Sequence, residues 1–391
     1  MNFDKVISRN NTRANKLEYR KLLFKTEDVI PLWVADMDFG IAVEIQDALK
    51  KRLEHPVFGY TNQDKEFFDA IINWLENKHN WEISSRSLTA ISGVIPALAM
   101  SIEALTNKGD KIMIQPPVYP PFFGLIEKSG RELVENPLKE NNGNYSIDFN
   151  DMEKSFANGV KMILISNPHN PVGKAWTRKE LETMVNLCIK YDVKILSDEI
   201  HSDLIMGEKP HIPIASISKE ASKISITCMS PTKSFNIAGL QIAYTIIENN
   251  FLRKAYRHEV NTLHLNMCNT MGTEALIAAY TKGNEWLNEA INYIKSNIEF
   301  VTNFIAEEIP EIKVSKNEAT YLLWIDFRSL NLSDSELKQF IIQKAKLGLN
   351  QGVDFGKGGS GFARLNVATP KTILEKAMKQ LKVAVENLKN N

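Results

Sequence analysis

The sequence predicts an α/β fold: a mostly parallel central sheet in a three-layer large domain, followed by a small α+β domain. Two observations support this fold. Short β-rich runs alternate with amphipathic helical stretches up to about Lys282, as in sheets covered by helices on both faces, and one long helical segment then replaces this alternation. At 391 residues, the chain has room for roughly two or three domains or lobes.

The elements of the large domain follow in chain order from their periodicity. A loop at Ser92-Gly93 opens into a helix, because apolar residues recur at helical spacing from Ile95 to Leu105. Arg178 to Tyr191 forms a second such helix with one apolar stripe. Five β-rich runs are predicted as strands, at 111–114, 161–166, 193–197, 223–228 and 242–247.

The carboxyl-terminal part has a different pattern. A long helix is predicted over 285–308, a strand over 321–327 and an amphipathic surface helix with a basic, solvated face over 370–391. We expect three regions: 1–44 as an amino-terminal segment that joins the small domain, 45–284 as the large domain and 285–391 as the small domain.

Composition excludes several classes of protein. Lys plus Arg and Asp plus Glu each total 47, so no net field attracts nucleic acid or an anionic membrane. No segment approaches the ~20 apolar residues that span a bilayer. The cysteines Cys188, Cys228 and Cys268 form neither a metal motif nor a disulfide framework, so we expect reduced core thiols and no metal site. A cytoplasmic protein is expected.

Polar residues follow three apolar strands directly. Lys233 lies in Ser230-Pro231-Thr232-Lys233, just past a strand end, where desolvation can lower the pKa of a lysine that forms a Schiff base with a carbonyl cofactor. Asp198 ends another strand and would face the ligand crevice, although capping a helix is the alternative. Asn170 lies in a Pro-rich turn after a third strand, which would present its amide rigidly.

A phosphate site is available where the Ser92-Gly93 loop opens into a helix, because free backbone amides there point along the helix axis. A phosphate cradle, an amide, a carboxylate and a lysine at four strand ends together describe a pocket for pyridoxal 5'-phosphate (PLP).

These motifs resemble those of the fold-type I PLP-dependent enzymes of the aminotransferase class I/II family, from about Phe39 to the final helix. The shared order is a Ser-Gly loop, an aromatic residue, Asn-Pro-His-Asn-Pro, Asp-Glu-Ile-His and Ser-Pro-Thr-Lys. Segments 31–39, 58–60, 198–204 and 361–366 further resemble the branch of cystathionine β-lyases and cysteine-S-conjugate β-lyases.

The resemblance implies roles in cofactor binding. Lys233 would carry PLP and transfer protons, Asp198 would pair with the protonated pyridine nitrogen, and Asn170 would bind the ring hydroxyl. The other cofactor contacts implied are Tyr119 stacked on the ring, His201 beside it, and Ser230 with the amides of Val94 and Ile95 at the phosphate.

The resemblance also implies how substrate and a second subunit are bound. Arg364 would take the α-carboxylate of a small amino-acid substrate in a bidentate fork, with Tyr119 and Asn170 beside it. Tyr60 would reach the phosphate bound by the neighbouring subunit, so a homodimer with shared sites is expected.

The chain departs from the wider family at three places. Gln241 stands where aminotransferases commonly have a phosphate-binding arginine, and His201 where they commonly have a tyrosine. Lys16-Leu17-Glu18-Tyr19-Arg20 replaces the Lys-Trp-Asp usual in the lyase branch, which affects entrance contacts and substrate preference.

The expected activity is that of a PLP-dependent carbon–sulfur β-lyase, which cleaves L-cystathionine or other L-cysteine S-conjugates to pyruvate, ammonia and a thiol. Two alternatives stay open. One is a PLP-dependent aminotransferase, which shares every step as far as the carbanion, and the other is a PLP-binding regulatory protein.

Overall fold

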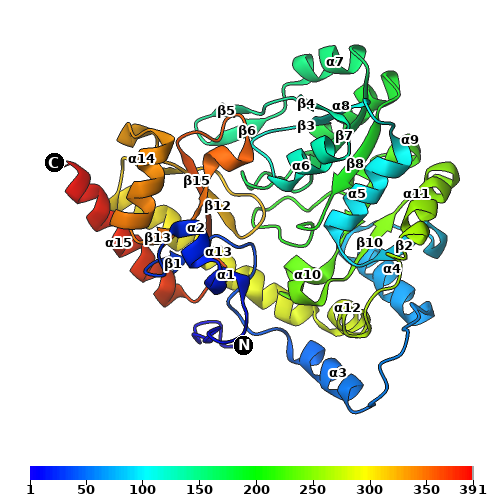
Figure 1. Ribbon diagram of the computed structural model, residues 1–391, viewed down its shortest axis with the longest axis horizontal. Helices are drawn as coiled ribbons and strands as arrows, with labels where there is room; N and C mark the ends of the chain where they lie inside the picture. Colours follow the sequence, from blue (N-terminus) through cyan, green and yellow to red (C-terminus); the bar gives the residue numbers. More distant parts are fainter. Residues whose placement is uncertain (390–391) are drawn as a thin grey trace.

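The computed structural model describes residues 1–389, and within them a large sheet has the strand order β2-β10-β9-β8-β7-β3-β4 (Figure 1). Its strands are Leu88–Ile91 (β2), Lys111–Ile114 (β3), Glu132–Glu135 (β4), Val160–Ser166 (β7), Lys194–Asp198 (β8), Ser225–Met229 (β9) and Ala243–Ile246 (β10). β4, β3, β7, β8 and β9 pair in parallel, and β10 runs antiparallel to both of its neighbours. The predicted mostly parallel sheet is confirmed.

Helices cover both faces of this sheet. Alternate residues of a strand point to opposite faces, so each face presents its own set of apolar side chains to the helices. Ile163 and Ile165 of β7 pack into a core with α7 (Phe149–Ala157), α8 (Arg178–Lys190) and α9 (Lys219–Ile224). Met162 and Leu164 pack into a second core on the opposite face, with α5 (Val94–Leu105), α6 (Pro121–Lys128) and α11 (Asn250–Thr262). The large domain is therefore three-layered, as predicted.

A smaller sheet has the order β11-β12-β15-β14 among the described residues. Its strands are Lys313–Val314 (β11), Leu322–Asp326 (β12), Asn350–Gln351 (β14) and Phe362–Asn366 (β15). The predicted long helix and tail helix are α13 (Asn284–Glu308) and α15 (Lys371–Lys389). Residues 390 and 391, which belong to the predicted tail helix and small domain, lie outside the described residues.

The amino-terminal segment lies against this carboxyl-terminal part. Strand β1 (Ile30–Pro31) pairs in parallel with β13 (Leu347–Gly348), and the amide of Asp38 donates to the carbonyl of Ala368 at 2.9 Å. Figure 1 shows the blue amino-terminal segment beside the orange and red elements of the carboxyl-terminal part. Residues far apart in sequence therefore meet beside the large domain.

The remaining elements connect these layers. The helices are α1 (Asn15–Glu18), α2 (Arg20–Phe24), α3 (Val43–Leu53), α4 (Lys65–His79), α10 (Pro231–Ser234), α12 (Thr270–Lys282) and α14 (Asp334–Gln339). The shorter turns of helix are Ser85–Ser87, Ile214–Ser216, Ala238–Leu240, Arg328–Leu330, Phe340–Lys344 and Gly352–Phe355, and β5 (Lys139–Asn141) pairs with β6 (Asn144–Ser146).

The strand predicted over 223–228 begins only at Ser225. Ser218 caps helix α9 by accepting a hydrogen bond from the amide of Ala221 at 3.0 Å, and this helix continues to Ile224. The three cysteines are free and buried, as expected. In the part of the chain that the structure describes, no helix combines the length and apolar character that crossing a bilayer requires.

Candidate active site

Three neighbouring parallel strands bring the predicted site residues to one edge of the large sheet. β7 leads into the loop that carries Asn170, β8 ends at Asp198, and β9 is followed by the turn that carries Lys233. The carboxyl ends of adjacent parallel strands meet at one edge, which is where ligands bind in open α/β sheets. Arg364 reaches the same place from β15, where its Nη1 donates to Oδ1 of Asn170 at 2.9 Å.

Lys233 is held at the start of helix α10. Oγ of Ser230 accepts a hydrogen bond from the amide of Thr232 at 3.0 Å and so caps this helix. Nζ of Lys233 donates to the carbonyl of Ala35 at 2.7 Å. Burial lowers the pKa of Lys233 to about 8, against the opposing charge of Asp36. Its amine is therefore partly neutral near neutral pH, as a nucleophile or base requires.

Asp198 is buried with little to stabilise its charge. Its side chain accepts a hydrogen bond from the amide of Ile200 at 3.1 Å, and the residue is 6% exposed. Burial raises the pKa of Asp198 to about 7, although Lys233 acts in the opposite direction. Residues 200–203 form a turn, so Asp198 caps a turn and not a helix. A cationic group beside Asp198 would favour its ionised form.

The loop of Asn170 is fixed by its own side chains. The amide of Asn170 donates to Oγ of Ser166 at 3.3 Å, and the indole of Trp176 donates to the carbonyl of Ser166 at 3.1 Å. Burial lowers the pKa of His169 to about 4, so this histidine is neutral and its Nε2–H donates to the carbonyl of Pro117 at 2.9 Å. The position of the Asn170 amide is therefore well defined.

Arg364 is a buried cation with an unused donor. It is 5% exposed, and within residues 1–389 it forms no ion pair and its Nε has no hydrogen-bond partner. Its Nη2 donates to the carbonyl of Trp33 at 3.0 Å and to Oδ1 of Asn350 at 2.7 Å. Burial lowers the pKa of Arg364 to about 10. A buried guanidinium without a carboxylate partner is suited to an anionic ligand.

Aromatic and imidazole groups line the same site. The pKa of Tyr119 is raised by burial and by the charge of Asp198, and Arg364 acts in the opposite direction, so Tyr119 lies near both. Burial, Lys233 and Arg364 lower the pKa of His201 to about 3, which keeps it neutral. Among the described residues, Nδ1 of His201 has no hydrogen-bond partner.

The residues predicted to contact the phosphate differ in their surroundings. Val94 and Ile95 begin helix α5, where backbone amides of the first turn have no acceptor within the helix. Oγ of Ser230 donates to the carbonyl of Ile242 at 2.6 Å, so its hydroxyl would have to turn to donate to a phosphate. Gln241 is exposed, and Tyr60 is 94% exposed.

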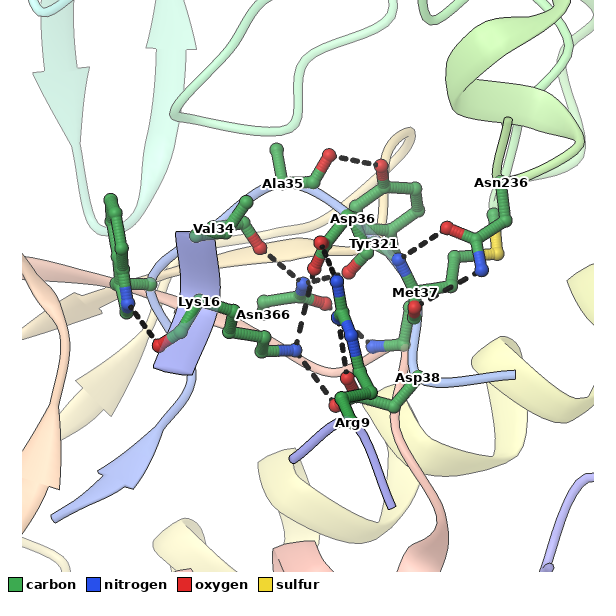
Figure 2. A network of polar contacts seen from close by, with 12 residues as sticks. Arg9, Lys16, Val34, Ala35, Asp36, Met37, Asp38, Asn236, Tyr321 and Asn366 are labelled. Atoms are coloured by element: carbon green, nitrogen blue, oxygen red, sulfur yellow. Dashed lines mark hydrogen bonds and ion pairs between the residues drawn. The ribbon is translucent and has the colours of Figure 1, made fainter. Parts of the chain in front are cut away.

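Sequence reasoning assigned no role to a group of residues beside the site. Tyr321 donates to the carbonyl of Ala35 at 2.9 Å, next to the bond from Lys233. Asn366 donates to the carbonyls of Val34 and Asp36 (Figure 2). Asn366 and the residues that it contacts lie in segments 361–366 and 31–39, which resemble the lyase branch, so a sequence feature marks them. Tyr321 lies outside both segments.

The residues present fit PLP. Its aldehyde requires an amine such as Lys233, its pyridine nitrogen a buried carboxylate such as Asp198, and its phosphate the amides at the start of helix α5. The unpartnered Nε of Arg364 leaves a donor for a substrate carboxylate. The donor set thus matches both an anionic cofactor and an anionic amino acid.

Comparison with known proteins agrees with this site. A family model described as aminotransferase class I and II matches residues 27–381. Cystathionine beta-lyase PatB of Bacillus subtilis (strain 168) is 41% identical over 386 residues, which cover 98% of this chain and all of that protein.

Two solved structures share the whole fold. A PLP-bound chain from Clostridium difficile 630, described provisionally as an aminotransferase, has a TM-score of 0.97 at 45% identity and covers 98% of this chain and 99% of its own. Cystalysin from Treponema denticola, which contains PLP, has a TM-score of 0.95 at 35% identity and covers 99% of both chains. The chain belongs to the aminotransferase class I and II family.

Proposed function

We propose that this chain is a PLP-dependent carbon–sulfur β-lyase that cleaves L-cystathionine or other L-cysteine S-conjugates to pyruvate, ammonia and a thiol. The observation that carries the proposal is the buried, unpaired guanidinium of Arg364 beside Asn170, at the site that also contains Lys233 and Asp198. The full-length similarity to a cystathionine beta-lyase supports this reaction.

Four side chains would hold the cofactor ring. Lys233 would carry it, Asp198 would face its pyridine nitrogen, Asn170 its hydroxyl and Tyr119 its ring face. When bound, PLP supplies an electron sink for the pair left on the substrate Cα. The phosphate would lie at the amides of Val94 and Ile95 with Ser230, and His201 would lie beside the ring as a neutral group.

Lys233 is suited to moving the proton from the substrate Cα. With a pKa of about 8, its amine titrates within about one pH unit of neutrality, the range in which general acid–base catalysis is effective. The carbonyl of Ala35, at 2.7 Å, orients the amine. The same amine can therefore take a proton at Cα and return it elsewhere in the reaction.

Arg364 would orient the substrate by its α-carboxylate. Three of its five N–H groups are held by Asn170, Asn350 and the carbonyl of Trp33, which leaves the Nε–H and one Nη1–H without an acceptor in the described chain. Because the guanidinium is fixed before substrate arrives, little side-chain entropy is lost on binding. Lysine could not reproduce this planar arrangement.

The proposal includes a homodimer in which Tyr60 reaches the neighbouring site. Its support is the exposure of Tyr60 (94%) together with Val57 and Phe58 in the same segment, since contiguous exposed apolar residues mark interaction surfaces. The hydroxyl of Thr61 lies 2.5 Å from that of Thr270, so the segment is held against α12.

We also propose the division into regions 1–44, 45–284 and 285–391, supported by the separate sheets and by the pairing of β1 with β13. A cytoplasmic location belongs to the same proposal.

Product analysis tests the activity. The purified, PLP-loaded protein is incubated with L-cystathionine and, separately, with an amino acid plus 2-oxoglutarate. We expect pyruvate, ammonia and free thiol from the first mixture. Glutamate without pyruvate would support the aminotransferase instead, and no turnover with PLP bound would support the regulatory protein.

A further inference from the structure

A segment of the chain, residues 33–39, passes directly beside the site, and we call it the strap. The carbonyl of Trp33 accepts a hydrogen bond from Arg364 at 3.0 Å, and the carbonyl of Ala35 accepts one from Lys233 at 2.7 Å. The position of the strap therefore helps to determine where the amine of Lys233 lies.

Other parts of the fold also bind the backbone of the strap (Figure 2). Three side chains, Tyr321, Asn366 and Asn236, donate hydrogen bonds of 2.6–3.1 Å to its carbonyls. These bonds fix the backbone of the strap, because buried carbonyls outside a sheet need such partners.

The two carboxylates of the strap face cations of the amino-terminal segment, as Figure 2 shows. Arg9 donates to Asp36 at 2.6 Å and to Asp38 at 3.0 Å. Nζ of Lys16 lies 2.7 Å from Asp38 and 3.6 Å from Asp36. Lys16 is only 1% exposed, and a lysine is almost never buried to this extent unless it is paired. Two cations thus balance two carboxylates.

The charge of Asp36 acts on Lys233, because the amine of Lys233 is bonded to the carbonyl of Ala35, the residue just before Asp36. Burial lowers the pKa of Lys233, as does Arg364, whereas Asp36 on the strap and Asp198 at the end of β8 raise it. His201 also lies near the amine and is neutral. Because the cations of Arg9 and Lys16 lie within 4 Å of Asp36, they reduce the field of this carboxylate at Lys233.

We propose that Arg9 and Lys16 are positioning residues for Lys233: they hold the strap against its amine and offset the charge of Asp36 that would otherwise keep the amine protonated. The inference rests on the proposed function in taking Lys233 as the lysine that carries the cofactor. Loss of either cation should therefore lower kcat more than it raises KM, because the amine would release its proton less readily.

The test titrates Lys233 itself in the cofactor-free, full-length protein. Acetic anhydride labels neutral amines, and mass spectrometry of the peptide that contains Lys233 gives the labelling rate at each pH. Arg9→Met and Lys16→Met should each raise the midpoint by about half a pH unit or more, and Asp36→Asn should lower it by a similar amount. The double variant Arg9→Met/Asp36→Asn should lie near the wild type.

Two variants serve as controls. Lys21→Met removes an exposed lysine from the neighbouring helix α2 and should leave the midpoint unchanged. Lys16→Arg keeps the positive charge, so its labelling midpoint should equal that of the wild type. In the PLP-loaded protein, the pH dependence of the visible absorbance gives a second readout that should move in the same directions.

An unchanged midpoint in all folded variants would overturn the inference, as would Arg9→Met and Asp36→Asn moving it in the same direction. If Lys16→Met does not fold, Arg9→Met decides, since the Arg9 side chain is 26% exposed and tolerates replacement better. PLP carried by another lysine would contradict the proposed function instead, while the titration of Lys233 in the cofactor-free protein would still decide on the role of Arg9 and Lys16.

Discussion

Replacing Arg364 by methionine should impair turnover severely and destabilise the cofactor-free protein only slightly. Folding buries this guanidinium to 5% exposure, and residues 1–389 supply no carboxylate partner. Burial lowers the pKa of Arg364 from 12.5 to about 10. At about 1.4 kcal/mol per pH unit, this corresponds to about 3 kcal/mol against the charged form in the folded protein.

The hydrogen bonds of Arg364 slightly outweigh this cost. The guanidinium donates to Trp33, Asn170 and Asn350, and three such hydrogen bonds from a charged group contribute about 4–5 kcal/mol in total at about 1.5 kcal/mol each. A methionine side chain can still pack against Phe355, whose ring centroid lies 5.1 Å from Cζ of Arg364. We therefore expect the free energy of unfolding to fall by only about 1–2 kcal/mol.

The effect on turnover should be far larger. Without Arg364, the α-carboxylate of the substrate would enter a buried site without its counter-ion. Truncating one partner of such a pair costs about 3–4 kcal/mol, which lowers kcat/KM by about 10²-fold to 10³-fold. A buried charge that adds little net stability but is needed for substrate binding is a mark of a functional site.

Two measurements check this prediction. Urea unfolding of the cofactor-free protein, followed by circular dichroism, gives the stability, and pyruvate formation from L-cystathionine by the loaded protein gives kcat/KM. Arg328→Met, which removes an exposed arginine beside Asp326, is the matched control and should change neither by much. A variant of Arg364 that loses several kcal/mol of stability, or keeps kcat/KM within about tenfold of the wild type, would refute the reasoning.

Two further predictions concern buried carboxylates. Burial raises the pKa of Asp198 to about 7, so the stability that this side chain contributes is complete below about pH 4 and is lost as the pH rises towards 7. Cofactor-free Asp198→Asn should therefore be more stable than the wild type above pH 7 and equally stable in acid. Urea unfolding at each pH measures the difference. His79→Ala removes the partner that lies 2.9 Å from Asp203. Burial would raise the pKa of Asp203, but its hydrogen bonds, including the one with His79, keep this pKa below its usual value. The free energy of unfolding of this variant should fall by about 3 kcal/mol at neutral pH and by less in acid, as urea unfolding at each pH would measure. His258→Ala, at an exposed histidine, should lose little stability. Equal losses of stability in the two variants would contradict the prediction.

Much of the site was predictable because strand ends carry it. Once the runs before Asn170, Asp198 and Lys233 are assigned as adjacent parallel strands, geometry places their carboxyl ends at one edge. The fold and the cofactor were predicted from these motifs and confirmed, whereas the roles of individual residues stay predictions.

The rest was not predictable because it depends on contacts between distant segments. Lys16 belongs to a short helix and would ordinarily be exposed, yet it is buried against Asp38, 22 residues away. The carbonyl of Ala35 meets Lys233 across 198 residues. Strand β4 has the same four-residue length as β3, but it begins and ends with a glutamate and lacks the apolar run that marks β3 in the sequence.

The most direct test of the account identifies the lysine that carries the cofactor. Borohydride reduction of the PLP-loaded protein fixes PLP to that lysine, and peptide mass spectrometry locates the label. The account predicts a single labelled peptide that contains Lys233, and no label in Lys233→Ala. Label on any other lysine, or an unlabelled Lys233 in active enzyme, would contradict it.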